Sequence, residues 1–150
     1  MTRPVCIITG ASSGIGYGLA TRFFESGYEV IVIARRLEKM EKWIAEIPNA
    51  ADHIHPYQCD VSQRDSVKKV SEEIKNTFKT IDCLILNAGV SQTCAVSNFD
   101  SEIIESSIQT NLLGGTRFLT EFLPVFIAQK RGQIVAISSL AAYRGLPGHS

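Results

Sequence analysis

Five short apolar runs alternate with segments of helical periodicity, and this alternation constrains the fold more than any other feature. Most positions in each run are apolar, without the polar alternation of a strand that has one face in water. Such runs are typical of strands in a parallel sheet that helices cover on both faces. The predicted strands are Val5–Ile8, Val30–Ala34, Ile54–Cys59, Cys83–Leu86 and Gln133–Ser138.

Helices are predicted between these strands, at Ile15–Glu25, Leu37–Glu46, Gln63–Phe78 and Phe99–Gln129. Parallel strands joined by right-handed helical crossovers form a doubly wound α/β sheet, so we expect a Rossmann-like fold in a single domain over residues 1–150. In such sheets ligands bind beyond the carboxyl ends of the strands. The residues that follow each strand are therefore the candidates for function.

Two local features refine the helices. Pro124 lies inside the longest helical segment, which we expect to be two helices with a bend at that proline. Ser62 and Asp65 precede an amphipathic run in the spacing of a capping box, so they are expected to begin the third helix.

Charge and cysteine content exclude several classes of protein. The 15 basic and 15 acidic residues cancel, which gives no indication of nucleic-acid or membrane binding. The four cysteines show no metal-binding spacing, and we expect them to be reduced and mostly buried. No run approaches the roughly 18 apolar residues of a membrane span. We therefore expect a cytoplasmic protein without a bound metal.

A glycine-rich loop joins the first strand to the first helix. Gly10 permits a tight turn, Gly14 lets the backbone approach a pyrophosphate, and Gly16 lets the helix pack closely on the strand. The N-terminus of the following helix offers free N–H groups to an anion. A simple turn is the alternative, but the position between a strand and an amphipathic helix favours a dinucleotide site.

The end of the second strand indicates which dinucleotide binds. Enzymes that use NAD place an acidic residue there, about 20 residues beyond the glycines, to hold the ribose 2′-hydroxyl. This chain has Ala34 followed by Arg35 and Arg36. A guanidinium can bind a 2′-phosphate through two hydrogen bonds. These residues therefore predict NADP(H), with a solvated helix start as the alternative.

These motifs together resemble the short-chain dehydrogenases/reductases. The chain carries T-G-x-x-x-G-x-G at 9–16, Cys-Asp-Val at 59–61, Asn-Ala-Gly at 87–89, Asn111, and Ile-Ser-Ser at 137–139 followed by two alanines at 141 and 142. The five matches come in the family's order and span the chain. The resemblance implies five of the family's seven strands, and a carbonyl or secondary alcohol as substrate. Family analogy also implies a homo-oligomer.

The resemblance implies a set of cofactor-binding residues. Some family members carry a basic residue where this chain has Ser13. Asp60 would bind adenine with help from the Val61 backbone, although it could instead cap the next helix. The Asn87–Gly89 segment would flank the ribose, with Asn87 bracing the central strand. The full predicted set is Gly10, Ser12, Ser13, Gly14, Ile15, Gly16, Arg35, Arg36, Asp60, Val61, Asn87, Ala88 and Gly89.

Two residues are predicted to take part in catalysis. Asn111 lies within a helical segment just before Gly114 and Gly115, both of which weaken a helix, and the resemblance implies that it holds a proton-relay water. Ser139 matches the family's serine that polarises the substrate carbonyl. The alternatives are an ordinary surface asparagine and a serine turn.

The family's catalytic Tyr and Lys are not found within the 150 residues. Counting from Ser139, the family pattern places the Tyr at position 152 and the Lys at position 156. Tyr143 has no Lys four residues later, so it does not match. We expect the chain to be part of a longer NADP(H)-dependent oxidoreductase and to be inactive alone. The alternatives are a non-catalytic NADP(H)-binding module and an interaction fragment that pairs through Phe99–Gln129.

Overall fold

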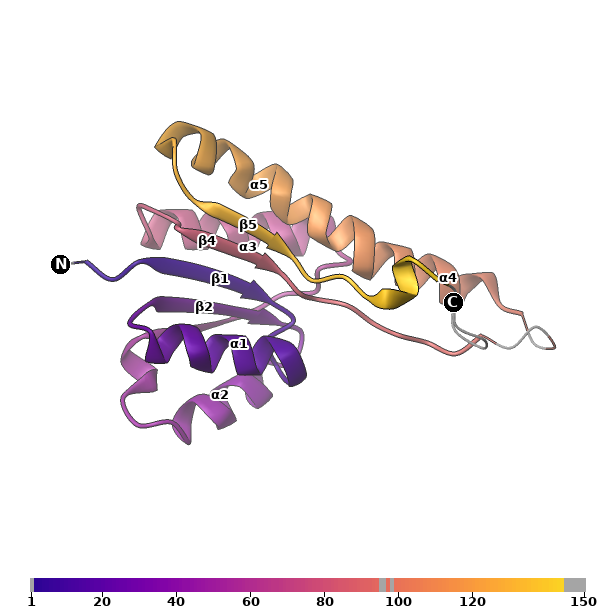
Figure 1. The fold of residues 1–150 in the computed structure, drawn as a ribbon, viewed down its shortest axis with the longest axis horizontal. Helices are drawn as coiled ribbons and strands as arrows, with labels where there is room; N and C mark the ends of the chain where they lie inside the picture. Colours follow the sequence, from indigo (N-terminus) through magenta and orange to yellow (C-terminus); the bar gives the residue numbers. More distant parts are fainter. Residues whose placement is uncertain (1, 95–96, 98, 145–150) are drawn as a thin grey trace.

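A five-stranded parallel sheet forms the centre of the molecule (Figure 1). The computed structural model describes residues 2–94, 97 and 99–144. The strand order is β3-β2-β1-β4-β5, which confirms the predicted doubly wound sheet. The strands are β1 (Val5–Thr9), β2 (Glu29–Ala34), β3 (Ile54–Gln58), β4 (Cys83–Leu86) and β5 (Gln133–Ala136).

Helices cover both faces of this sheet. Figure 1 shows α1 and α2 on one face and α3 and α5 on the other. A short helix, α4, and a π-helical turn, η3, precede α5. The helices are α1 (Gly14–Glu25), α2 (Leu37–Ala45), α3 (Arg64–Thr77), α4 (Ser101–Ile108), η3 (Gln109–Leu113) and α5 (Gly114–Gln129), with 3₁₀ turns η1 (Ala50–Asp52) and η4 (Leu140–Ala142).

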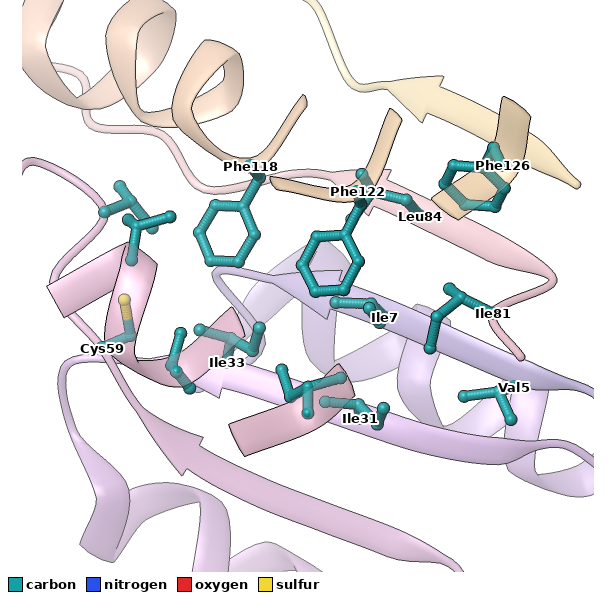
Figure 2. Close-up of a cluster of buried hydrophobic side chains, with 14 residues drawn as sticks. Val5, Ile7, Ile31, Ile33, Cys59, Ile81, Leu84, Phe118, Phe122 and Phe126 are labelled. Atoms are coloured by element: carbon teal, nitrogen blue, oxygen red, sulfur yellow. The ribbon is translucent and has the colours of Figure 1, made fainter. Parts of the chain in front are cut away.

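Each face of the sheet has its own apolar core. On one face, phenylalanines spaced four residues apart in α5 reach down onto β1, β2 and β4; they are Phe118, Phe122 and Phe126 (Figure 2). On the other face, Met40 and Trp43 from α2 pack with Ala20 from α1. The apolar runs of β1 and β2 supply side chains to both cores, as expected for strands buried on both sides.

The two edge strands differ from the central ones. β3 contains Pro56, which has no N–H to donate, and among the described strands β3 pairs with β2 alone. In the part of the chain that the structure describes, β5 pairs with β4 alone, and three of its four residues are exposed. The polar residues His55 and Gln58 in β3 fit this edge position.

The helical segment Phe99–Gln129 is divided, but not where the sequence predicts. The division falls at the π turn Gln109–Leu113, whereas Pro124 lies inside α5. Asn111 lies in this turn and Gly114 follows it directly. They explain the position of the division, because a polar amide and a glycine both weaken regular helical structure.

The capping box predicted for α3 is wrong. The helix begins after Gln63, whose side chain makes no capping hydrogen bond. Ser62 instead donates its backbone N–H and its hydroxyl to Oδ1 of Asp60, at 2.9 Å and 2.8 Å. The serine thus completes a turn around Asp60 and does not cap the helix.

The cysteines are free thiols, as the sequence predicts: Cys6, Cys59 and Cys83 are buried, and Cys94 is partly exposed. Among the described residues, no helix combines the length and the apolar character that crossing a bilayer requires.

Candidate functional site

A cleft of about 280 Å³ opens at the carboxyl ends of β1 to β4. It includes the point between β1 and β4 where the order of successive strands in the sheet changes direction. This is the position at which doubly wound sheets bind their ligands. Most residues of the predicted cofactor set line it. The predicted residues that line it are Gly10, Ser12, Ser13, Ile15, Arg35, Arg36, Asp60, Val61, Asn87, Ala88 and Gly89. The cleft is also lined by Ala34, Cys59, Val90 and Thr110, which were not predicted.

The glycine-rich loop forms the floor of the cleft. Gly10 and Gly14 adopt positive φ angles of 70° and 61°, which side chains disfavour. Apart from its chain neighbours and the adjoining helix backbone, no described atom lies within 4 Å of where a Cβ of Gly14 would be, so the loop is open at that point. Gly16 is the opposite case, since its Cβ would lie 2.5 Å from the Gly10 carbonyl oxygen. Neither Gly14 nor Gly16 lines the cleft; both shape the loop that does.

Thr9 ties this loop to the end of β4, a role that the sequence did not reveal. Its buried hydroxyl accepts hydrogen bonds from the backbone N–H groups of Asn87 and Ala88, both at 3.0 Å. It donates in turn to the carbonyl of Ile85 at 3.4 Å. Three backbone groups of β4 and the turn after it therefore depend on one hydroxyl.

Replacing Thr9 with valine should lower the free energy of unfolding by about 2–4 kcal/mol, because two N–H groups lose their acceptor and one carbonyl its donor. The Thr9→Ser variant keeps the hydroxyl and should stay within about 1 kcal/mol of the parent. Urea unfolding of both variants measures the difference. Equal stability of the valine and serine variants would contradict the hydroxyl's role.

Asn87 completes the bracing from the other strand. Its side-chain Nδ2 donates to the carbonyls of Thr9 at 2.9 Å and Gly10 at 3.3 Å. The predicted bracing contact is therefore present. It fixes the separation of β1 and β4 at the point where the cleft opens, so Asn87 shapes the site as well as lining it.

The two arginines lie where β2 ends. Both side chains are exposed, and both residues line the cleft. Arg36 Nη2 donates to the hydroxyl of Ser12 at 3.0 Å, so its guanidinium lies across the glycine-rich loop. The carbonyl of Arg35 accepts from Gln58 Nε2 at 3.0 Å, which anchors the backbone of this turn to the end of β3.

The far wall of the cleft follows β3. Asp60 is partly buried, and its Oδ1 accepts the two hydrogen bonds from Ser62 described above. Val61 beside it is buried. Burial raises the pKa of the Cys59 thiol, so this neighbour of Asp60 is uncharged at neutral pH.

Asn111 lies on the π turn and makes a reciprocal contact with the loop after β4. Its Nδ2 donates to the carbonyl of Val90 at 2.8 Å, and its Oδ1 accepts from the Val90 N–H at 2.7 Å. The side chain is exposed, yet its amide nitrogen and its amide oxygen are both bonded to the backbone of Val90. π turns of this kind occur frequently at functional sites.

Ser139 lies beyond β5, outside the set of described residues that line the cleft. It precedes the turn η4, where its Oγ accepts from the N–H of Ala141 at 3.2 Å. The residue is exposed, and so is Tyr143, at 89%. This contact is the one that a simple serine turn would make, and among the described residues none accepts a hydrogen bond from the Ser139 hydroxyl.

Sequence comparison identifies the family. The family model for the short chain dehydrogenases matches residues 4–150. An uncharacterised oxidoreductase of Listeria innocua is 37% identical over 97% of the chain, and the 3-oxoacyl-[acyl-carrier-protein] reductase of Thermotoga maritima is 32% identical over the same share. The chain spans 59% of the length of each of these relatives.

Solved structures agree with the sequence comparison. A short-chain dehydrogenase from Streptomyces avermitilis matches 99% of the chain and 53% of its own with a TM-score of 0.90 at 26% identity. An alcohol dehydrogenase from the archaeon Thermococcus sibiricus, complexed with 5-hydroxy-NADP, matches 97% of the chain and 62% of its own with a TM-score of 0.89 at 28% identity. With a family match over nearly its whole length and this fold, the chain belongs to the short-chain dehydrogenase family.

Proposed function

We propose that the chain is the cofactor-binding portion of an oxidoreductase that moves hydride between NADP(H) and a carbonyl or secondary alcohol. The observation that carries the choice of NADP(H) is the pair Arg35 and Arg36 at the end of β2, where both line the cleft. Ala34 and the two arginines directly after it put no carboxylate at the strand end to repel a 2′-phosphate. The cofactor of the Thermococcus relative supports the same choice.

The other predicted residues take roles around this nucleotide. The loop from Gly10 to Gly16 holds the pyrophosphate, which the open space beside Gly14 supports. Asp60 and Val61 bind adenine, and the segment Asn87–Gly89 lies along the ribose. Asn111 holds a relay water, and Ser139 polarises the substrate carbonyl.

The remaining parts of the proposal concern the whole protein. The Tyr and Lys of the family pattern lie beyond residue 150, so the 150 residues alone are inactive. The protein is cytoplasmic, which its free cysteines support, and it assembles as a homo-oligomer, for which family analogy is the support.

The Arg35→Asp variant of the full-length protein tests the cofactor. Losing a charge-assisted bond to the 2′-phosphate and adding a carboxylate should shift the ratio of NADPH to NADH affinity by roughly 10- to 100-fold toward NADH. Fluorescence titration with both cofactors measures the ratio. The control is Arg22→Asp, which makes the same charge change on the exposed side of α1. An unchanged ratio in Arg35→Asp would refute the proposed nucleotide preference.

A further inference from the structure

Arg117, in the first turns of α5, bonds two segments that border the cleft. Its Nη1 donates to the carbonyl of Val61 at 3.0 Å and to the carbonyl of Gln109 at 3.1 Å. Its Nη2 donates to Gln109 Oε1 at 2.6 Å. The guanidinium thus fastens the turn after β3 to the first residue of the π turn.

Both partners of Arg117 continue into the candidate site. Val61 lines the cleft, and Gln109 is followed by Thr110, which lines it too, and by Asn111. Arg117 is not among the described residues that line the cleft. Any effect that it has on a bound cofactor must therefore pass through the backbone of its partners.

Gly114 makes a second contact between α5 and Val61, this time with the Val61 side chain. A Cβ on Gly114 would lie 2.8 Å from Val61 Cγ2 and 3.1 Å from Val61 Cβ. The start of α5 therefore packs directly on the Val61 side chain while Arg117 binds the Val61 carbonyl. With both contacts in place, a shift of Val61 must also shift the π turn.

The connection extends to the loop after β4. Asn111, two residues beyond Gln109, exchanges two hydrogen bonds with Val90, and Val90 also lines the cleft. Val61 and Val90, which follow different strands, are therefore joined through Arg117 and the π turn. Hydrogen bonds made by residues outside a site hold the residues of the site in their functional positions.

We propose that Arg117 is a positioning residue that couples occupation of the adenine end of the cleft to the placement of Asn111. The proposal rests on the function proposed above, which assigns the Val61 end to adenine and Asn111 to the relay water. A nucleotide that presses on Val61 fixes Gln109 through the guanidinium. That constraint holds the π turn, and with it the Asn111–Val90 pair.

The test uses adenosine 2′,5′-bisphosphate, a probe that carries the adenine and the 2′-phosphate but no nicotinamide. The readout is amide hydrogen exchange at Val90, whose N–H bonds to Asn111 Oδ1. In the full-length parent, saturating probe should slow this exchange by roughly threefold or more. In Arg117→Met, saturating probe should leave the exchange at Val90 unchanged, because the connection between Val61 and Gln109 is cut.

Glu121→Gln is the matched control. It weakens the 2.8 Å ion pair by which Glu121 joins α5 to Lys75 of α3, but leaves the contacts of Arg117 intact. This variant should keep the full response at Val90. If Arg117→Met responds like the parent, or if Glu121→Gln loses the response equally, the proposal is overturned. Should Arg117→Met fail to fold, Arg117→Gln takes its place: its shorter side chain carries one amide instead of the guanidinium and cannot hold both the Val61 and the Gln109 carbonyls. A full response in that variant overturns the proposal.

Failure of the proposed function gives a different pattern. If the parent binds ADP but not the bisphosphate, the NADP(H) preference is wrong, and the Arg117 test is carried out with ADP. If the parent binds neither probe, the adenine site itself is wrong, and the role of Arg117 falls with it.

Discussion

Replacing Gly16 with alanine is expected to abolish dinucleotide binding and to lower the free energy of unfolding by about 3 kcal/mol or more. The added Cβ would lie 2.5 Å from the Gly10 carbonyl oxygen, 2.6 Å from Asn87 Nδ2 and 2.9 Å from Ala11 Cα. Two of these neighbours are backbone atoms of the glycine-rich loop, which cannot move aside without carrying the cleft floor with them. Denaturant unfolding and cofactor titration measure the two effects.

Gly18→Ala is the control for this prediction, two residues further along the same helix. Apart from its chain neighbours and the backbone of its own helix, no described atom lies within 4 Å of the position of its Cβ. Alanine is the better helix former, so this variant should be more stable by about 0.5–1 kcal/mol and should bind cofactor normally. The close approach at Gly16 would be disproved if both alanine variants unfolded at the same denaturant concentration as the parent.

The contrast among the glycines shows what the sequence could predict. The spacing of Gly10, Gly14 and Gly16 between a strand and a helix was enough to place a dinucleotide loop. It also predicted that Gly16 permits close packing. It could not show that the neighbour in contact would be Asn87, because that residue is 71 positions away and meets the loop only when β1 and β4 pair.

The same limit explains the contacts that were missed. From the sequence, Thr9 was interpreted only as the first residue of the glycine-rich motif. In the structure its hydroxyl forms hydrogen bonds with backbone groups of residues 76 to 79 positions away. The π turn was missed because Pro124 is the strongest local signal for a break in its segment, while the structure divides the segment at Asn111. Arg117 gave no signal at all, since its acceptors are mostly backbone carbonyls.

Ser62 could form either of two local structures, a capping box with Asp65 or a turn with Asp60. The spacing of Ser62 and Asp65 fits a capping box, yet Asp60 lies close enough to take the serine's N–H and hydroxyl first. The strands were easier to predict than these contacts, because a continuous apolar run indicates burial on both faces whichever strands and helices pack against it. The right-handed crossover rule favoured a doubly wound sheet and so placed the ligand site beyond the carboxyl ends of the strands, but the order of the strands came from the structure.

Ser139→Ala is expected to lower kcat of the full-length protein by roughly 10²- to 10³-fold, the usual cost of removing one donor to a developing oxyanion. The affinity for NADPH should not change, because Ser139 lies outside the described lining of the nucleotide cleft. Its hydroxyl accepts from the Ala141 N–H, and no described residue accepts from it, so the hydroxyl can donate to a carbonyl. Steady-state kinetics with a carbonyl substrate and a separate cofactor titration distinguish the two effects.

Ser138→Ala is the matched control, since it removes the neighbouring exposed hydroxyl from the same strand end. It should leave kcat within about twofold of the parent, as expected of a surface substitution. Full turnover in Ser139→Ala would show that its hydroxyl only completes the turn at η4. If the full-length parent binds NADPH but turns over no carbonyl or alcohol, the alternative of a non-catalytic nucleotide-binding module gains support. The next encoded residues then bear on the same choice, because a Tyr at 152 and a Lys at 156 are what the enzyme requires beside Ser139 to protonate the carbonyl.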